Sequence, residues 1–197
     1  EANGQKRQGA WHIHTKDLVG PDGRGGATHE VAPIELDHTR YRWALHQKLW
    51  AVDAETGHDK WTFDPHLQIN PGFQHLTCRG VSFHQTPADA TDSDGNPAPT
   101  DCAKRIVLPV NDGRLVEVDA ETGQKCSGFG NDGELDLRLP NQPYTTPGMY
   151  EPTSPPVITD KLLIANSPIT DNGTIKQASG ATQAVDAYTG HPLPAFD

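Results

Sequence analysis

The chain has 197 residues and a formal net charge of −10, and it contains no run rich in lysine or arginine, which argues against nucleic acid as a partner. Glycine (19 residues) and proline (17) are plentiful while only 34% of the residues are hydrophobic, and no helical periodicity persists beyond two turns, so the composition predicts an all-β chain. The longest apolar runs, such as residues 162–165, are far too short to span a bilayer. The chain starts at Glu1 without a signal-peptide pattern, as expected of a mature or excised segment.

Short strands bounded by turn residues are predicted along the whole chain. They are expected at residues 10–15, 31–36, 39–45, 48–52, 60–63, 80–84, 105–110, 113–118, 124–126, 155–159, 162–166 and 182–185. Two polar stretches, residues 85–104 and 131–148, are predicted to be long loops. The turn Asn111-Asp112-Gly113 is expected to have type I′ geometry, because Asp-Gly suits that hairpin turn.

One motif occurs three times at a nearly fixed interval. An apolar strand ends at an Asp and turns through Thr-Gly at Asp53, Asp119 and Asp186, which lie 66 and 67 residues apart (119 − 53 and 186 − 119). Such self-similarity is typical of a repeat architecture, in which one strand–turn–strand unit is copied and stacked. The hairpins near residues 51–61, 117–127 and 184–194 therefore predict consecutive blades of a β-propeller, with residues 1–197 forming part of one propeller domain.

Three cysteines are present, Cys78, Cys102 and Cys126, so at least one thiol is free or pairs with another chain. A bridge between Cys102 and Cys126 is conceivable if their strands end side by side, and the sequence leaves that question open. The strand at residues 39–45 is unusual, because alternation places Arg40 and Arg42 on one face and predicts that this face is solvated.

Four stretches resemble the membrane-bound quinoprotein dehydrogenases of the glucose and quinate type, which use pyrroloquinoline quinone (PQQ). The stretches are residues 28–34, 73–82, 110–115 and 150–161. The Asp-x-x-Thr-Gly hairpin also looks like the tryptophan-docking motif of that family, although only the first repeat keeps its Trp, while Ser127 and Pro194 stand at the equivalent places. The resemblance implies an eight-bladed propeller of which this chain supplies roughly three blades.

The resemblance also implies roles for six residues. Glu30, His75, Arg79 and Thr153 look like contacts to PQQ, and Asp171 and Asn172 look like oxygen ligands of a Ca²⁺ or Mg²⁺ ion beside it. A guanidinium suits the three carboxylates of PQQ, and a hard divalent cation suits carboxylate and amide oxygens. The family's catalytic Asp is expected in later blades, so no catalytic residue is predicted in this chain.

The implied activity is the oxidation of a sugar, polyol or quinate-like alcohol, with ubiquinone as electron acceptor of the parent enzyme. The resemblance places the parent in the periplasm, anchored in the inner membrane by a segment absent here, and makes the remaining propeller blades partners of this chain. Two alternatives stay open at this point. One is a non-catalytic propeller that scaffolds other proteins, and the other is an inactive fragment, because three open blades expose sheet edges that normally pack on neighbours.

Overall fold

The computed structural model describes residues 11–12, 28–29, 31–44, 46–67, 73, 76–138, 149–166 and 181–193. Every regular element in these residues is a strand, and none of them belongs to a helix long and apolar enough to cross a membrane. The strands are β1 (Thr28–His29), β2 (Ile34–Leu36), β3 (Thr39–Trp43), β4 (Leu49–Asp53), β5 (Asp59–Phe63), β6 (Thr77–Cys78), β7 (Ser82–Gln85), β8 (Lys104–Val110), β9 (Arg114–Asp119), β10 (Glu134–Asp136), β11 (Val157–Ile158), β12 (Leu162–Ala165) and β13 (Gln183–Asp186).

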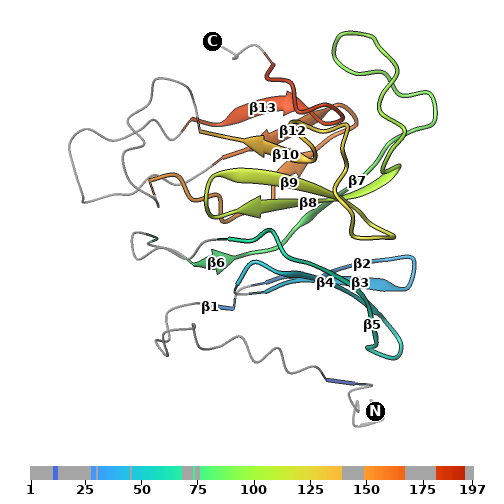
Figure 1. Cartoon of the computed structure of the whole chain (residues 1–197), viewed down its shortest axis with the longest axis vertical. Helices are drawn as coiled ribbons and strands as arrows, with labels where there is room; N and C mark the ends of the chain where they lie inside the picture. The colour runs from blue at the N-terminus through green and yellow to red at the C-terminus, as the bar shows by residue number, and fades with distance from the viewer. Residues whose placement is uncertain are drawn as a thin grey trace, which may run out of the picture.

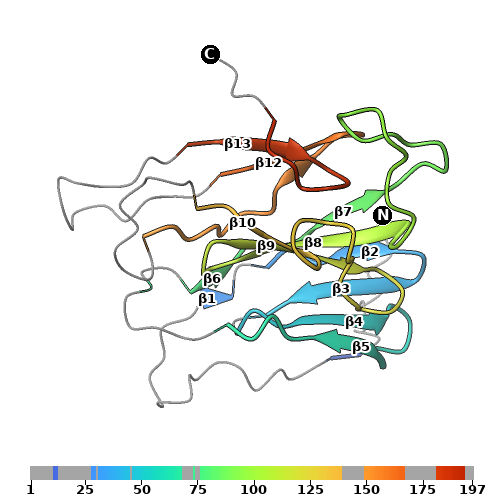
Figure 2. The ribbon, with the colours of Figure 1, turned by 45° about the horizontal axis from the view of Figure 1, so that its top comes forward.

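Three antiparallel sheets are stacked face to face (Figures 1 and 2). The first sheet has the order β2-β3-β4-β5, the second β7-β8-β9-β10 and the third β11-β12-β13, so each sheet is a meander of consecutive strands. This arrangement is that of successive propeller blades, and the all-β propeller prediction is confirmed. A fourth, two-stranded sheet pairs β1 with β6 in parallel.

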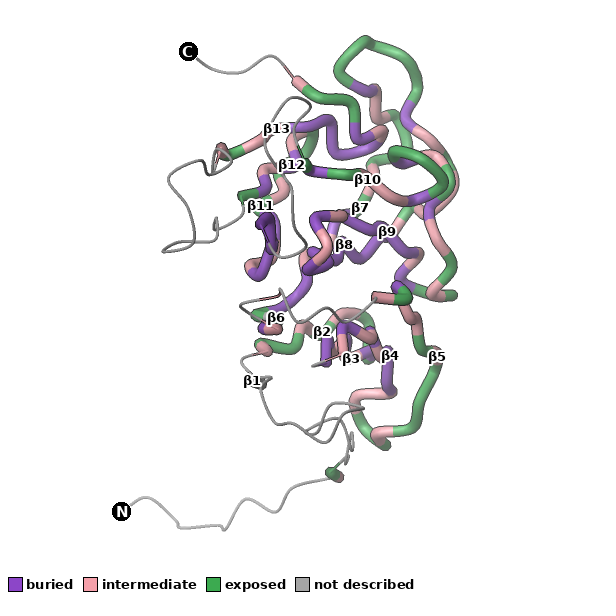
Figure 3. Tube along the Cα trace, turned by 60° about the vertical axis from the view of Figure 1, so that its left-hand side comes forward, coloured by how far each residue is buried: buried purple, intermediate pink, exposed green. Residues whose placement is uncertain are grey.

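The second sheet lies between the other two, and its central strands, β8 and β9, are buried on both faces (Figure 3). Successive side chains of a strand point to opposite faces, and the two apolar clusters follow that alternation. Ile106 and Leu108 of β8 join the cluster shared with the first sheet, whereas Val107 joins the cluster shared with the third. Because both faces of β8 are buried, its sequence is an almost continuous apolar run.

The three Asp-x-x-Thr-Gly turns have the same structure. In the first turn, Oδ1 of Asp53 accepts hydrogen bonds from the backbone N–H and the hydroxyl of Thr56, both 2.8 Å, and Gly57 N donates to the Asp53 carbonyl over 2.8 Å. The corresponding bonds recur at Asp119 and Asp186. The closing glycines have φ values of 74°, 73° and 74°, in the left-handed region that favours glycine.

Each turn receives an aromatic ring from the chain that precedes it. Trp61, from the first repeat, lies on Gly123 of the second, and its indole N–H donates to the Ala120 carbonyl over 3.2 Å. Trp11 lies on Gly57 in the same way, and its N–H donates to the Ala54 carbonyl over 3.0 Å. Trp11 thus occupies a docking position that the sequence did not reveal.

The ring at the third turn belongs to Phe129, which lies on Gly190. The prediction that Ser127 stands at the docking position is therefore wrong, because the connection after the second turn is two residues longer before its aromatic residue. Pro194, at the corresponding position of the third repeat, lies outside the described residues. Phenylalanine supplies the ring but has no side-chain N–H, so the third turn receives no hydrogen bond from its docking ring.

Two local predictions for the second sheet are also wrong. Residues 124–126 form only an isolated bridge, and the fourth strand is β10, inside the stretch predicted to be a loop. The loop 111–113 is not a type I′ turn, because only Gly113 has positive φ and its N–H donates to the Val110 carbonyl. Three residues, rather than two, separate the paired ends of β8 and β9.

The arginine face of β3 is partly covered by two tryptophans. The guanidinium carbon of Arg40 lies 5.4 Å from the ring centroid of Trp11, and that of Arg42 lies 5.2 Å from the ring centroid of Trp50. Both arginines are partly buried rather than freely solvated.

The pairing of the cysteines, which the sequence left open, is given by the structure. Cys102 and Cys126 form a disulfide with a Cα–Cα distance of 5.6 Å.

Candidate functional site

The segments that lead into the three sheets lie side by side. Parallel pairing places Thr28 opposite Thr77 and His29 opposite Cys78. The contact continues along the chain, because Ala32 N donates to the Arg79 carbonyl over 3.2 Å and Arg79 N donates to the Thr153 carbonyl over 3.1 Å. Three stretches that lie far apart in the sequence, and that carried the resemblance, thus meet in one place.

Gly80 allows this close approach. Its φ is +150°, and a Cβ at this position would lie 3.3 Å from the Ala32 carbonyl oxygen and 3.5 Å from Cγ of Pro155. A residue with a Cβ would be strained at this φ and would require the Ala32 carbonyl to move by a few tenths of an ångström. Glycine is therefore favoured where the second segment passes the first.

Arg79 and Thr153 are brought together as predicted from the resemblance. Nη1 of Arg79 donates to Oγ1 of Thr153 over 3.4 Å and to Oγ of Ser154 over 3.3 Å. Thr153 is buried, whereas the Arg79 side chain remains exposed at the surface. The result is an exposed cation with two hydroxyl neighbours, and a guanidinium of this kind can bind an anionic group through charge-assisted hydrogen bonds.

The other predicted site residues, Glu30, His75, Asp171 and Asn172, lie outside the described residues, so their roles stay predictions. Within the described ranges, no group of three or more His, Cys, Asp or Glu side chains could hold a metal ion. Ser154 is a contact of Arg79 that sequence reasoning missed. Its position directly after Thr153, in a stretch already singled out, was the available signal.

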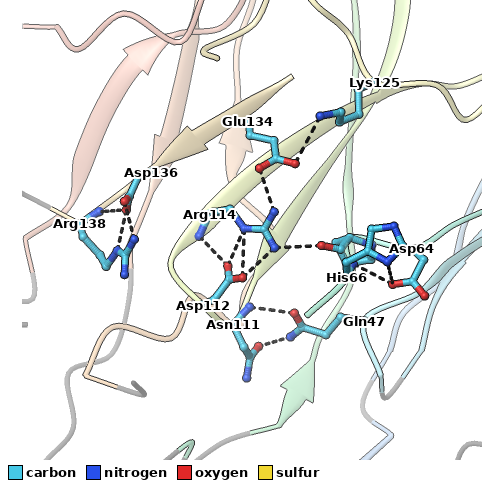
Figure 4. Close-up of polar contacts among 11 residues, drawn as sticks. Gln47, Asp64, His66, Asn111, Asp112, Arg114, Lys125, Glu134, Asp136 and Arg138 are labelled. Atoms are coloured by element: carbon cyan, nitrogen blue, oxygen red, sulfur yellow. Dashed lines mark hydrogen bonds and ion pairs between the residues drawn. The ribbon is translucent and has the colours of Figure 1, made fainter. Parts of the chain in front are cut away.

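Two polar contacts join the first and second sheets at their loops (Figure 4). The buried side-chain amides of Gln47 and Asn111 are hydrogen bonded, and Asn111 N donates to Oε1 of Gln47 over 2.8 Å. Arg114 binds the carboxylates of Asp112 and Glu134, at 2.7 and 2.8 Å, and donates to the Pro65 carbonyl over 3.0 Å. These contacts fix the two sheets relative to each other.

A groove of about 220 Å³ between the same sheets is lined by the docking residues around Trp61, and neither Arg79 nor Thr153 lines it. At its rim Lys104 Nζ lies 2.5 Å from Oδ2 of Asp37, and this hydrogen bond lowers the pKa of Asp37 and raises that of Lys104. The groove belongs to the contact between the sheets, so the candidate site is the place where the three leading segments meet.

Comparison with protein families decides the assignment. Residues 1–197 match the PQQ family described as "Glucose/ethanol/alcohol dehydrogenase, beta-propeller domain". The chain belongs to this family. Membership in the quinoprotein family agrees with the stacked meanders and with the convergence of the leading segments, and it confirms the resemblance noted from the sequence.

Quinoprotein glucose dehydrogenases are among the most similar proteins. The chain is 75% identical over 188 residues to that of Gluconobacter oxydans (strain 621H) and 46% identical over 188 residues to that of Escherichia coli (strain K12). Each match covers 95% of this chain but 23% of the relative, so the chain spans about a quarter of their length. The quinohemoprotein alcohol dehydrogenase from Comamonas testosteroni matches with a TM-score of 0.61 and 22% identity, over 84% of this chain and 20% of that chain, which supports the fold alone.

Proposed function

We propose that this chain is part of a PQQ-dependent dehydrogenase that oxidises a sugar, polyol or quinate-like alcohol, with glucose as the first substrate to test. The observation that carries the proposal is 75% identity over 95% of the chain to a quinoprotein glucose dehydrogenase. We also propose ubiquinone as the electron acceptor, and a periplasmic parent anchored in the inner membrane. A non-catalytic scaffold is not favoured, because it gives no reason for Arg79 and Thr153 to converge.

The described part of the site fits PQQ in its chemistry. PQQ carries three carboxylates, and Arg79 presents an exposed guanidinium whose neighbours are the hydroxyls of Thr153 and Ser154. Glu30 and His75 are proposed as further polar contacts, and Asp171 and Asn172 as ligands of Ca²⁺ or Mg²⁺. When bound, PQQ supplies the redox chemistry as the acceptor of the substrate's hydride.

In this proposal the residues of this chain would bind and orient the cofactor. Arg79 provides the charge that neutralises a carboxylate, and the backbone bonds to Ala32 and Thr153 fix the position from which its side chain extends. Thr153 is buried, and its hydroxyl accepts a hydrogen bond from the Arg79 guanidinium over 3.4 Å. No residue of the described chain is assigned to remove the substrate proton.

The test is an assay of the whole protein that contains this chain. The apoprotein, given PQQ together with Ca²⁺ or Mg²⁺, should oxidise glucose with a dye as electron acceptor, and omission of PQQ should abolish the activity. Polyols and quinate, assayed in parallel, would identify the substrate class if glucose fails. Inactivity towards every one of these alcohols, in a folded protein loaded with PQQ and metal, would contradict the proposal.

A further inference from the structure

The loop between β7 and β8, residues 86–103, is closed at its base by covalent and polar contacts. The disulfide between Cys102 and Cys126 joins the loop to the stretch that follows β9. Next to it, Oδ2 of Asp101 accepts hydrogen bonds from Oγ of Ser127 over 3.0 Å and from Gly128 N over 2.9 Å. The loop is therefore anchored to its own sheet at two adjacent points.

The tip of this loop is a preformed turn. Asp92 is buried, and its Oδ1 accepts hydrogen bonds from the backbone N–H groups of Asp94 and Asn96, over 3.0 and 2.8 Å. A bridge between Thr91 and Pro97 closes the same turn. The backbone N–H of Ser93 takes no part in these contacts within the turn.

That N–H group reaches the third sheet. Ser93 N donates to Oδ2 of Asp186 over 2.6 Å, at the residue that begins the third Asp-x-x-Thr-Gly turn. Beside it, Lys161 Nζ donates to Oγ1 of Thr91 over 3.1 Å, and Nδ1 of His191 lies 3.9 Å from Oδ2 of Asp94. The loop of the second sheet thus contacts the third repeat at three residues, Lys161, Asp186 and His191.

Asp186 differs in this respect from its two counterparts. At Asp53 and Asp119, all hydrogen bonds from the described residues go to Oδ1, whereas Asp186 uses both carboxylate oxygens. Asp186 is fully buried, while the other two are partly exposed. The third turn is also the one whose docking ring, Phe129, has no N–H to donate.

A buried arginine adds to the same contact. Arg105 pairs with Glu117 at 2.8 Å inside the second sheet, and its Nη1 also lies 3.4 Å from the carbonyl oxygen of Tyr188 in the third turn. Its Nε donates to the Cys102 carbonyl over 3.2 Å, at the disulfide itself. Disulfide, arginine and third turn are therefore connected by direct contacts.

From these contacts we infer that residues 86–103 form an inter-blade clasp. Together with the bond from Gly130 N to the Thr189 carbonyl (2.9 Å), the clasp fastens the third repeat to the second at a turn whose docking ring has no N–H to donate. The Cys102–Cys126 disulfide fixes the base of the clasp, so the redox state of this cysteine pair sets how firmly the third repeat is held. The inference concerns the fold itself and does not depend on the proposed activity.

Hydrogen exchange of residues 181–193 in the whole protein tests the clasp. Asp186→Asn keeps Oδ1 for the turn but places an NH₂ group, which cannot accept a hydrogen bond, opposite Ser93 N. Loss of a charge-assisted bond should speed exchange at these residues by about tenfold or more. Asp53→Asn and Asp119→Asn, in turns without a partner for Oδ2 among the described residues, are matched controls and should change exchange in their own turns much less.

The disulfide is tested by the double variant Cys102→Ser/Cys126→Ser and, should it fail to fold, by reduction of the wild type. Dithiothreitol acts by thiol–disulfide exchange: both cysteine sulfurs become thiols, and the reagent supplies two electrons and closes to a cyclic disulfide. Either treatment should speed exchange at residues 181–193, and the reagent should not speed it further in the double variant. Unchanged exchange after disulfide loss, or equal effects of Asp186→Asn and Asp119→Asn, would overturn the inference.

Discussion

Trp61 lies so close to Gly123 that a Cβ on residue 123 would stand 2.5 Å from Cε3 of the indole ring. Real Cβ atoms do not approach other atoms at this distance, so the ring requires glycine at the turn. The contact joins the first repeat to the second, and Trp11 on Gly57 repeats it. The glycine of the Thr-Gly turn therefore serves both the left-handed backbone and the docking of a neighbouring repeat.

Gly123→Ala should destabilise the protein strongly. The variant combines the strain of an L-residue at φ +73°, on the order of 1–3 kcal/mol, with a clash against Trp61. Gly95→Ala is the matched control, because its φ is +85° but nothing lies within 4 Å of the added Cβ. Melting temperatures of the whole protein should fall much further for Gly123→Ala, and equal losses would contradict the docking role.

Trp61→Phe should convert the second turn into a copy of the third. The ring is kept, but the 3.2 Å hydrogen bond from the indole N–H to the Ala120 carbonyl is lost. Because the Tyr41 hydroxyl still donates to the same carbonyl over 2.9 Å, we expect a loss of only about 1 kcal/mol. Hydrogen exchange at residues 114–124 measures this cost, and a loss several times larger would mean that indole packing dominates.

The repeated turns were predictable because they depend on local chemistry. Asp, Thr and Gly form each turn through bonds within five residues, so the sequence alone reveals all three. The docking ring was predictable at Trp61, but not at Phe129, because the length of the connecting loop shifts its position. Strand β10 was missed for a different reason, since its pairing with β9 is set by the sheet rather than by a pattern in its own residues.

The candidate site was predictable in part. Arg79 and Thr153 were identified by resemblance, and no periodicity or spacing indicated that they touch, because 74 residues separate them. Ser154 was missed because its residue type carries no signal, and only its position directly after Thr153 indicated it. The buried pair Arg105–Glu117 was also not predicted. A charged residue in an apolar strand is normally expected to be exposed, and only the structure shows that a neighbouring sheet covers this pair.

Glu117 should make stability fall as pH rises. Burial raises the pKa of this carboxyl to about 8, opposed by Arg105, and its Oε1 has no hydrogen-bond partner among the described residues. Because the pKa in the folded protein lies above the unfolded value of 4.5, the contribution of Glu117 to the free energy of unfolding is fully present below pH 4.5. This contribution is lost as the pH rises to about 8. Relative to wild type, Glu117→Gln should therefore gain several degrees of melting temperature over this range, and a relative loss would show that the ionised pair is stabilising.

His84 should have the opposite effect at acid pH. Burial and the nearby Arg105 lower its pKa below 6.5, against weaker opposing effects of Asp160 and Asp186, and its ring centroid lies 5.4 Å from that of Tyr188. A lowered pKa gives stability that is present above pH 6.5 and is lost as the pH falls towards the lowered value. In the variant His84→Gln, the melting temperature should fall less than that of the wild type as the pH is lowered below 6.5. The matched control is His58→Gln, at an exposed histidine, and its melting temperature should follow that of the wild type at every pH.

The most direct measurement is the affinity of the whole apoprotein for PQQ in Arg79→Ala, compared with Arg40→Ala. Arg40 is the control because it is a partly exposed arginine paired with Glu35 at 2.9 Å, on a strand that does not contribute to the site. Loss of a charge-assisted contact to a carboxylate should weaken PQQ binding by about tenfold or more in Arg79→Ala, with partial recovery in Arg79→Lys. Wild-type affinity in Arg79→Ala would contradict the account, because the convergence of the three segments on Arg79 would then not form part of the cofactor site.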